Sequence, residues 1–153
     1  MAGYRSFHWA PAYWAPALAL LVCCATAPGR AVAGEWPQAL ACAFDGGTTW
    51  SYDGGAFAAR PPSPLAFDLR AIDLDGQTAE LVARPDSAPS SLRLVRAINA
   101  NHFIEVANEG FLNLTTIYDL DPKTGRHPAV HSRHFGILGQ PVFAQYTGSC
   151  APR

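Results

Sequence analysis

Turn-forming residues recur along this chain at short intervals, and their spacing leaves little room for helices. From residue 39 onward, runs of β-branched, aromatic and aliphatic residues are interrupted by Gly, Pro, Asp or Asn at a spacing of roughly 8–12 residues. No segment of ten residues follows the 3.6-residue period of an amphipathic helix. We therefore predict an all-β domain of eight or nine antiparallel strands, either a sandwich or a closed barrel. The predicted turns fall at 45–47, 53–55, 61–64, 75–76, 85–91, 99–101, 109–110, 121–126 and 139–141.

Two kinds of turn residue carry specific expectations. Asp75-Gly76 is the strongest hairpin signal, because a type I′ turn needs a positive φ at both central residues. Gly46-Gly47 and Gly54-Gly55 are interpreted as hairpin glycines too. The acid pairs Asp73/Asp75 and Asp119/Asp121 flank turns, so we assign them to turn geometry rather than to acid–base catalysis.

Residues 1–33 have the three parts of a secretory signal peptide. They contain two Arg and no acid, an apolar run that covers 15–25, and small residues at the end in Ala31-Val32-Ala33. The run is shorter than the roughly 20 apolar residues that span a bilayer, so no stable membrane span is expected after cleavage. An alternative is a lipoprotein acylated at Cys23 or Cys24. We expect a periplasmic or secreted domain at 34–153.

Composition excludes some classes of partner for that domain. Removal of 1–33 leaves 120 residues with 9 basic and 12 acidic side chains, a net charge of −3. This balance argues against a nucleic-acid partner and against a polybasic membrane patch. The sequence contains no P-loop and no G-x-G-x-x-G, and we expect no cofactor. The remaining partners are a small ligand or an envelope protein, and the oligomeric state stays open.

Cys42 and Cys150 are the two cysteines of the predicted exported domain. An isolated pair in an exported protein indicates a disulfide, and two cysteines allow one connectivity. The bridge encloses roughly 107 residues, for which the chain-entropy account gives about 4–5 kcal/mol of stability. Because the bridged Cα atoms must be close, the first and last strands must be neighbours. This favours a barrel over a sandwich.

The last hairpin predicts which side chains share a face. A two-residue loop at Gly139-Gln140 pairs Phe135 with Ala144 and His131 with Gly148, since the residues of an antiparallel pair lie directly opposite each other. The core face then contains Phe135, Ile137, Val142, Ala144, Tyr146 and Cys150, and the opposite face contains Ser132, His134, Gln145, Thr147 and Ser149.

This register also points His131 and Arg133 inward, at the end of the barrel near Cys150. A buried guanidinium stays charged, so Arg133 needs an acid, carbonyl groups or a ligand anion. The internal candidates for a partner are Glu105, Asp119 and Tyr146. The candidate patch for a ligand or partner consists of His131, Arg133, His134 and Tyr146.

Catalytic and metal-binding patterns are weak. There is no G-x-S-x-G elbow, and both cysteines of the domain are assigned to the disulfide. His131 and His134 point to opposite faces of a strand, which disfavours a metal pair. An enzyme with His131 or His134 as general base remains an alternative.

Several segments resemble those of small exported β-proteins of alphaproteobacteria that have no assigned function. These segments are 114–118, 130–136, 145–146 and 148–150. In size and in its terminal cysteines the chain is also similar to periplasmic lysozyme inhibitors, which are small disulfide-closed β-barrels. The resemblance implies an exported location. The predicted function is a non-enzymatic binding module for a small ligand or protein partner, with inhibition of a hydrolase such as lysozyme as an alternative.

Overall fold

The described residues form nine antiparallel strands and contain no helix. The computed structural model describes residues 35–107, 110–135 and 139–153. The predicted signal peptide and the alternative lipidation sites Cys23 and Cys24 lie outside these residues. No helix in the described ranges is long and apolar enough to cross a membrane. The strands are β1 (Leu40–Asp53), β2 (Ala56–Arg60), β3 (Leu65–Asp73), β4 (Thr78–Val82), β5 (Ser90–Arg96), β6 (Ala100–Ala107), β7 (Phe111–Tyr118), β8 (His127–Phe135) and β9 (Val142–Pro152).

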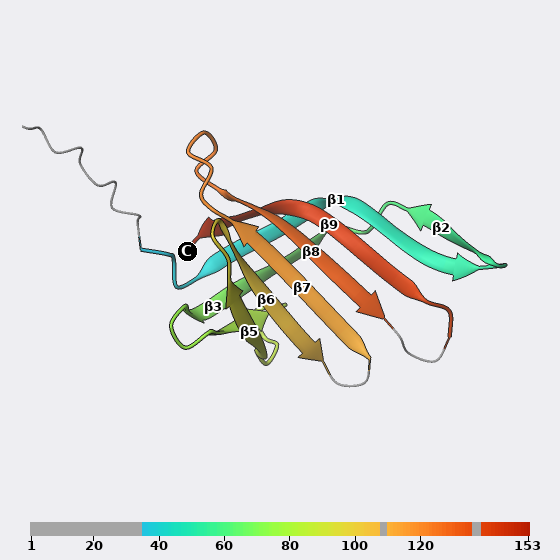
Figure 1. The fold of residues 1–153 in the computed structure, drawn as a ribbon, viewed down its shortest axis with the longest axis horizontal. Helices are drawn as coiled ribbons and strands as arrows, with labels where there is room; N and C mark the ends of the chain where they lie inside the picture. Colours follow the sequence, from blue (N-terminus) through green and yellow to red (C-terminus); the bar gives the residue numbers. More distant parts are fainter. Residues whose placement is uncertain (1–34, 108–109, 136–138) are drawn as a thin grey trace, which may run out of the picture. The chain divides into compact units, whose positions relative to one another are not determined.

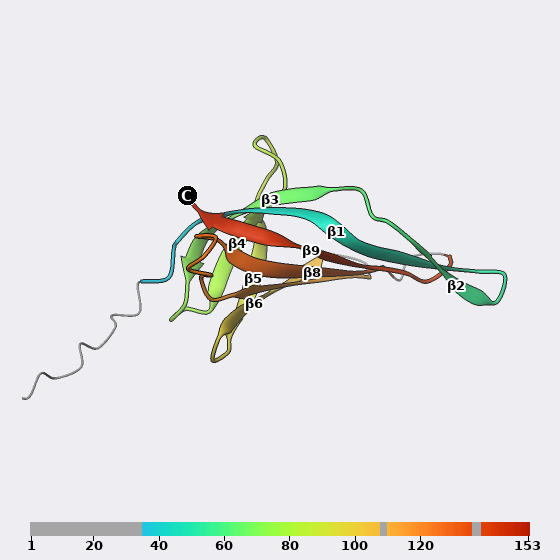
Figure 2. The same ribbon diagram turned by 90° about the horizontal axis from the view of Figure 1, so that it is seen from above.

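Pairing between the first and last strands closes the sheet. The strand order is β2-β1-β3-β4-β5-β6-β7-β8-β9, and β1 also pairs with β9. Eight strands therefore form a closed barrel, which confirms the predicted all-β class and the preference for a barrel (Figure 1). The remaining strand, β2, pairs with β1 but is not part of the closed barrel. Figure 2 shows it at the opposite end of β1 from the end of β9 marked C.

The long strand β1 changes its neighbour part-way along. Leu40 to Phe44 pair with β3, whereas Thr49 to Asp53 pair with β2. β9 pairs with both halves on the other side, across a β-bulge between Phe44 and Gly46. β1 therefore runs on beyond the start of β3, and β2 pairs with the part of β1 that β3 leaves uncovered.

The prediction of a hairpin at Gly46-Gly47 is wrong. Both glycines lie inside β1, where this strand approaches β9 too closely for a side chain. A Cβ on Gly47 would lie 2.8 Å from the Cα of Tyr146, and a Cβ on Gly148 would lie 2.7 Å from the Cα of Phe44. The glycines therefore permit close packing of two strands, a need that sequence pattern does not distinguish from a turn.

The two predicted tight turns have different outcomes. Gly54 and Gly55 have φ values of 58° and 90°, as a two-residue hairpin loop requires. The type I′ turn predicted at Asp75-Gly76 is wrong, because the positive φ there falls on Gln77, at 56°. A side-chain carboxylate organises that turn instead: Asp73 Oδ1 accepts hydrogen bonds from the backbone N–H groups of Asp75 and Gly76. Asp73 thus has the predicted turn role.

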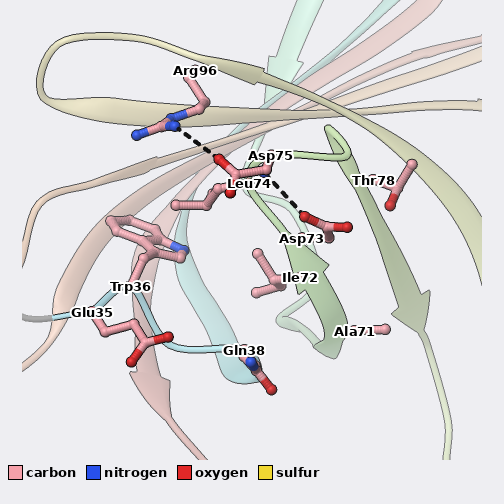
Figure 3. Close-up of a pocket in the computed structure, with 10 residues that line it drawn as sticks. All are labelled: Glu35, Trp36, Gln38, Ala71, Ile72, Asp73, Leu74, Asp75, Thr78 and Arg96. Carbon is pink, nitrogen blue, oxygen red and sulfur yellow. Dashed lines mark hydrogen bonds and ion pairs between the residues drawn. The ribbon is translucent and has the colours of Figure 1, made fainter.

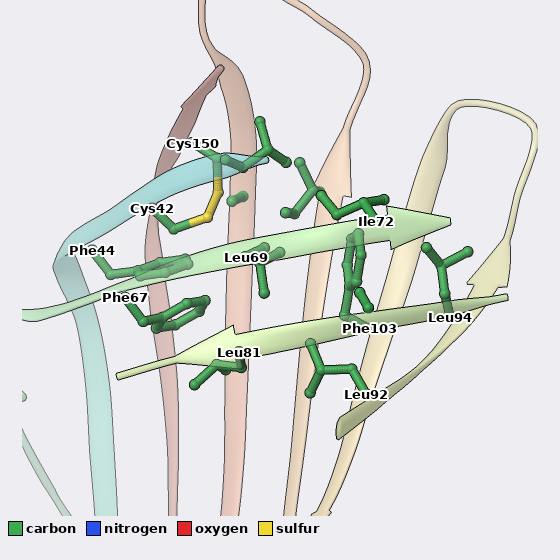
Figure 4. Packing of buried hydrophobic residues seen from close by; sticks show 14 of the residues in the cluster. Cys42, Phe44, Phe67, Leu69, Ile72, Leu81, Leu92, Leu94, Phe103 and Cys150 are labelled. Carbon is green, nitrogen blue, oxygen red and sulfur yellow. A yellow bond between two sulfur atoms is a disulfide. The ribbon is translucent and has the colours of Figure 1, made fainter. Parts of the chain in front are cut away.

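The disulfide between Cys42 and Cys150 is confirmed. The two residues lie directly opposite each other in the β1–β9 pair, with Cα atoms 4.0 Å apart. Around the bridge, large apolar side chains from five further strands fill the barrel (Figure 4). We call this end of the barrel the disulfide end. The largest fully buried side chains of the barrel are Leu40, Phe44, Leu69, Leu94, Phe103, Ile117 and Cys150.

The β8–β9 pair confirms the predicted face and corrects the predicted register. Ala144, Tyr146 and Cys150 are buried on one face, as expected. However, Phe135 pairs with Val142 and His131 pairs with Tyr146, a shift of two residues from the prediction. A shift of two keeps every side chain on its face but moves it along the barrel axis.

The corrected register also moves the candidate site. His127, not His131, lies beside Cys150. His131 is four residues and Arg133 six residues farther along β8. The prediction that His131 and Arg133 lie at the disulfide end is therefore wrong. They point into the opposite end of the barrel, which we call the mouth.

Removing the bridge tests its contribution to stability. The double variant Cys42→Ala/Cys150→Ala should lose about 4–5 kcal/mol of unfolding free energy, because its denatured chain is no longer closed into a long loop. Urea denaturation under oxidising conditions measures this difference. Reductant should lower the stability of the wild-type protein to a similar level and leave the variant unchanged. Equal stability of wild type and the double variant under oxidising conditions would contradict a stabilising role of the bridge.

Candidate functional site

The barrel has a cavity at each end, and the two cavities differ in how their polar groups are used. At the disulfide end, a cavity of about 730 Å³ lies beside the turn between β3 and β4 (Figure 3). Three of its four charged residues, Asp73, Asp75 and Arg96, have partners within the fold, and the fourth is Glu35. Asp73 holds the turn, and Asp75 forms an ion pair with Arg96 at 3.7 Å. This acidic cavity is therefore explained in large part by the local structure.

Trp36 packs at the same end. Its ring lies 4.8 Å from the imidazole of His127, and Nδ1 of His127 lies 2.9 Å from the carbonyl oxygen of Tyr118. Trp36 Nε1 is buried without a hydrogen-bond partner among the described groups. The remainder of this ring packs against the apolar core. Its main contribution is to cover the core.

The mouth contains the second cavity, of about 490 Å³, and we take it as the candidate site. This volume lies within the roughly 300–1,000 Å³ that is typical of small-ligand pockets. Six consecutive strands, β3 to β8, contribute to its wall. The part contributed by β3 and β4 is apolar, Arg84 and Ser90 follow it, and β6 to β8 carry most of the polar and charged groups. The lining residues are Leu65, Ala66, Phe67, Leu81, Ala83, Arg84, Ser90, Glu105, Phe111, Asn113, His131 and Arg133.

Three of these residues form a row across neighbouring strands. Glu105 of β6 lies opposite Asn113 of β7, and Asn113 lies opposite Arg133 of β8. Residues at the same level of adjacent strands point to the same face of a sheet. The cavity wall therefore carries a carboxylate, an amide and a guanidinium side by side, with the amide between the two charges.

The carboxylate and the amide of this row are joined. Asn113 Nδ2 donates a hydrogen bond to Glu105 Oε2 at 2.7 Å. This contact fixes the orientation of the amide, and Asn113 Oδ1 is left buried without a partner. An unpaired buried acceptor costs about 1–3 kcal/mol. Asn113 therefore offers an acceptor to whatever enters the cavity.

The guanidinium of the row has no partner within the described residues. Arg133 Nε is buried without a hydrogen bond, and no carboxylate in those ranges lies within 4.0 Å of the guanidinium. Its Cζ lies over the ring of Phe135, 4.9 Å from the ring centroid. This cation–π contact holds the charge in place but does not satisfy its N–H donors.

His131 forms the floor of the cavity, next to Arg133. Its residue is 3% exposed, and its ring packs against Phe67 and Tyr146, with centroids 5.2 and 5.9 Å away. Its Nδ1 lies 2.8 Å from Thr115 Oγ1. Burial, and to a lesser degree the charge of Arg133, lower the pKa of His131 to about 4. His131 is therefore neutral at neutral pH.

The structure brings together three of the four residues in the predicted patch. His131 and Tyr146 pair directly, and Arg133 follows on the same face. His134 is exposed on the outer face of the barrel, where its ring stacks with that of Phe143 at 6.4 Å. His134 therefore cannot act with the other three on one small ligand in the mouth.

None of the three predicted internal partners of Arg133 forms a hydrogen bond or ion pair with it among the described contacts. Glu105 lies in the same cavity, but its hydrogen bond comes from Asn113 rather than from Arg133. Asp119 is wrong as a partner, because it is exposed and follows the end of β7, at the disulfide end. No hydrogen bond joins Tyr146 to Arg133 among the described contacts.

Sequence reasoning missed Asn113. A signal was present in the alternation of β7, where Phe111, Asn113, Thr115 and Ile117 occupy positions of one parity. Polar residues at inward positions of a strand indicate that the barrel interior is polar at that level. Its pairing with Glu105 and Arg133 could not be read without the registers of two strand pairs.

The site has no features of a metal centre, and comparison gives no family. Within the described ranges, no three His, Cys, Asp or Glu side chains are grouped so as to hold a metal ion. No family model, no curated protein and no solved structure matches the chain. The cavity itself must therefore indicate the function.

The buried His131 predicts a pH dependence of stability. Above its ordinary pKa of 6.5, His131 is neutral in both the folded and the unfolded protein. As the pH falls from 6.5 to about 4, the unfolded protein takes up the proton first, and stability drops by up to about 1.4 kcal/mol per pH unit. In urea denaturation from pH 7.5 to pH 4.5, His131→Gln should show a smaller loss than wild type.

His134→Gln is the matched control on the outer face. It should keep the wild-type dependence on pH, because the substitution lies on the outer face and leaves His131 and its buried surroundings unchanged. Identical pH profiles of wild type and His131→Gln would contradict the burial of a neutral imidazole.

Proposed function

We propose that this protein is an exported, non-enzymatic binding module that holds a small zwitterionic ligand, of the α-amino acid type, in the barrel mouth. One observation carries the proposal. Arg133 and Asn113 are cross-strand neighbours that both line the cavity, and each has a buried polar atom without a hydrogen-bond partner among the described groups, the donor Arg133 Nε and the acceptor Asn113 Oδ1.

Arg133 selects a carboxylate. Its planar guanidinium suits a carboxylate that accepts two parallel hydrogen bonds. A doubly charged anion such as phosphate is less suitable beside Arg133, since the carboxylate of Glu105 lies in the same row, whereas the second arginine of the lining, Arg84, is exposed beyond the end of β4. A single negative charge next to Arg133 balances the guanidinium without strong repulsion from Glu105.

Asn113 and Glu105 select a donor next to that carboxylate. Asn113 Oδ1 accepts no hydrogen bond from the described groups, and the negatively charged carboxylate of Glu105 lies next to it. An ammonium group satisfies both, because it donates hydrogen bonds and is positively charged. In an α-amino acid one carbon separates the ammonium from the carboxylate, so both groups can reach neighbouring positions of the Glu105–Asn113–Arg133 row.

The opposite wall selects an apolar side chain. Four large apolar residues line the cavity outside the polar row. Three lie on β3 and β4, and Phe111 lies on β7 with Asn113; the three are Leu65, Phe67 and Leu81. Burial of an apolar group there gains about 25 cal/mol per Å² of surface removed from water. A ligand with an aromatic or branched aliphatic side chain therefore fits better than a small polar one.

The location and the alternatives belong to the same proposal. The leader pattern of 1–33 and the disulfide support export to the periplasm or outside the cell. The role of general base has less support, because the pKa of His131 is about 4 and His134 lies on the outer face. Inhibition of lysozyme rests on the layout of the termini, without a matching inhibitory loop.

Three probes that share a phenyl group test the ligand class by calorimetry. L-Phenylalanine carries both charges, 3-phenylpropanoate carries the carboxylate alone, and 2-phenylethylamine carries the ammonium alone. We expect affinity to fall in that order, because Arg133 contributes the larger, charge-assisted interaction. Equal binding of all three, or binding of none, would contradict the proposal.

Two variants separate the roles within the polar row. Arg133→Gln should weaken both carboxylate probes at least tenfold, the usual scale of a charged hydrogen bond. Glu105→Gln keeps the acceptor for Asn113 but loses the charge, so it should weaken L-phenylalanine and leave 3-phenylpropanoate unchanged or tighter. The melting temperature of Arg133→Gln should stay near that of wild type. A large decrease would show that Arg133 is structural.

A further inference from the structure

The strand β2 presents an open edge beyond the closed barrel. It pairs with β1 on one side, and no described strand pairs with its other side (Figure 1). All five of its residues are exposed. Exposed edges commonly carry Lys, Pro or a bulge that blocks pairing with another chain. The sequence Ala56-Phe57-Ala58-Ala59-Arg60 has only the Arg at its end, so this edge is unprotected.

The register of the β1–β2 hairpin shows which backbone groups face outward. Asp53 and Ala56 flank the two-residue loop and are partners, as are Ser51 and Ala58. In such a hairpin the pair beside the loop exchanges hydrogen bonds, and hydrogen-bonded pairs then alternate with non-bonded ones. Phe57 and Ala59 therefore turn their N–H and C=O groups away from β1, toward the open edge.

We propose that β2 pairs antiparallel with β2 of a second copy of this chain, about a twofold axis at Ala58. Phe57 then lies opposite Ala59 of the other copy, and each pair exchanges its two outward backbone hydrogen bonds. This register uses all five residues of the strand and satisfies both outward-facing residues of each copy. Pro61 and Pro62 follow Arg60, so the paired segment cannot extend further.

Charge complementarity favours a second copy over an unrelated strand. In this register Arg60 lies opposite Ala56 of the partner copy, and Asp53 is the hairpin partner of Ala56. Asp53, Ala56 and the incoming Arg60 thus occupy one level and point to one face. Ala56 is small, so the guanidinium can reach across it to the carboxylate. The twofold axis produces this ion pair twice.

The other face of the same strands adds apolar contact. Phe57, which is 53% exposed, packs on Tyr52 and Phe143 with ring centroids 5.1 and 5.6 Å away. Trp50 stacks on Phe143 at 4.8 Å. In the proposed dimer the two Phe57 side chains lie on the same face near the axis. Two aromatic clusters then join into one surface.

Sedimentation equilibrium of the purified protein tests the self-association. Because the paired strands are short, we expect a weak dimer, with the average mass rising toward two chains as the concentration approaches about 1 mM. Ala59→Pro removes an outward N–H and keeps the hydrogen bonds to β1, so it should weaken dimerisation at least tenfold. Ala59→Val, which keeps the N–H, should dimerise like wild type.

Charge exchange tests the register. Asp53→Arg alone and Arg60→Asp alone each place like charges together twice and should weaken the dimer about tenfold. The double variant Asp53→Arg/Arg60→Asp should recover the wild-type association. All variants should melt like wild type, because Arg60 lies on the added strand β2, and Asp53 ends β1 beyond its pairing with β9, where its side chain makes one exposed hydrogen bond, with Gln140. A single-chain mass for wild type at about 1 mM would overturn the proposal, and so would a double variant no tighter than the single ones.

Discussion

The pairing of β1 with β9 is the interaction on which the rest of this structure depends. It joins the beginning of the domain to its end, and the Cys42–Cys150 bridge lies within it. Once the sheet is closed, alternate residues of eight strands must point into one interior. The same pairing makes Gly47 and Gly148 necessary. On the other side of β1, β3 pairs only with Leu40 to Phe44, so the distal part of β1 pairs with β2. Closure therefore creates the enclosed cavity, and the early end of the β1–β3 pair leaves room for the strand with the exposed edge.

Polarity changes along the barrel axis, and this change gives the two ends different roles. Apolar side chains such as Leu69, Phe103 and Ile117 form the core of the barrel around the bridge. The mouth carries a neutral imidazole, an amide, a carboxylate and a guanidinium on neighbouring strands. Of the Arg133 guanidinium, Nε is buried without a hydrogen-bond partner among the described groups, and this unpaired donor is the basis of the proposed ligand site.

Much of the fold could be predicted from sequence, because turn residues act locally and an isolated pair of cysteines allows one connectivity. The face of Tyr146 and Arg133 was also predictable, because a register error of two preserves alternation. The position along the axis was not, since loop length between β8 and β9 had to be assumed. Gly46-Gly47 suggested a turn although it marks close strand packing. The Glu105–Asn113–Arg133 row needed two strand registers at once, and no local pattern contains that information.

The proposed ligand site depends on Arg133 Nε as the hydrogen-bond donor to a ligand carboxylate. Proton–nitrogen correlation spectra of the arginine Nε–H groups test it directly, with Arg133→Gln to assign the signal. Addition of L-phenylalanine should shift the Arg133 Nε–H resonance downfield, as expected for a new hydrogen bond to a carboxylate, and should leave the signal of Arg96 at the disulfide end unchanged. An unshifted Arg133 signal at saturating L-phenylalanine would contradict the account.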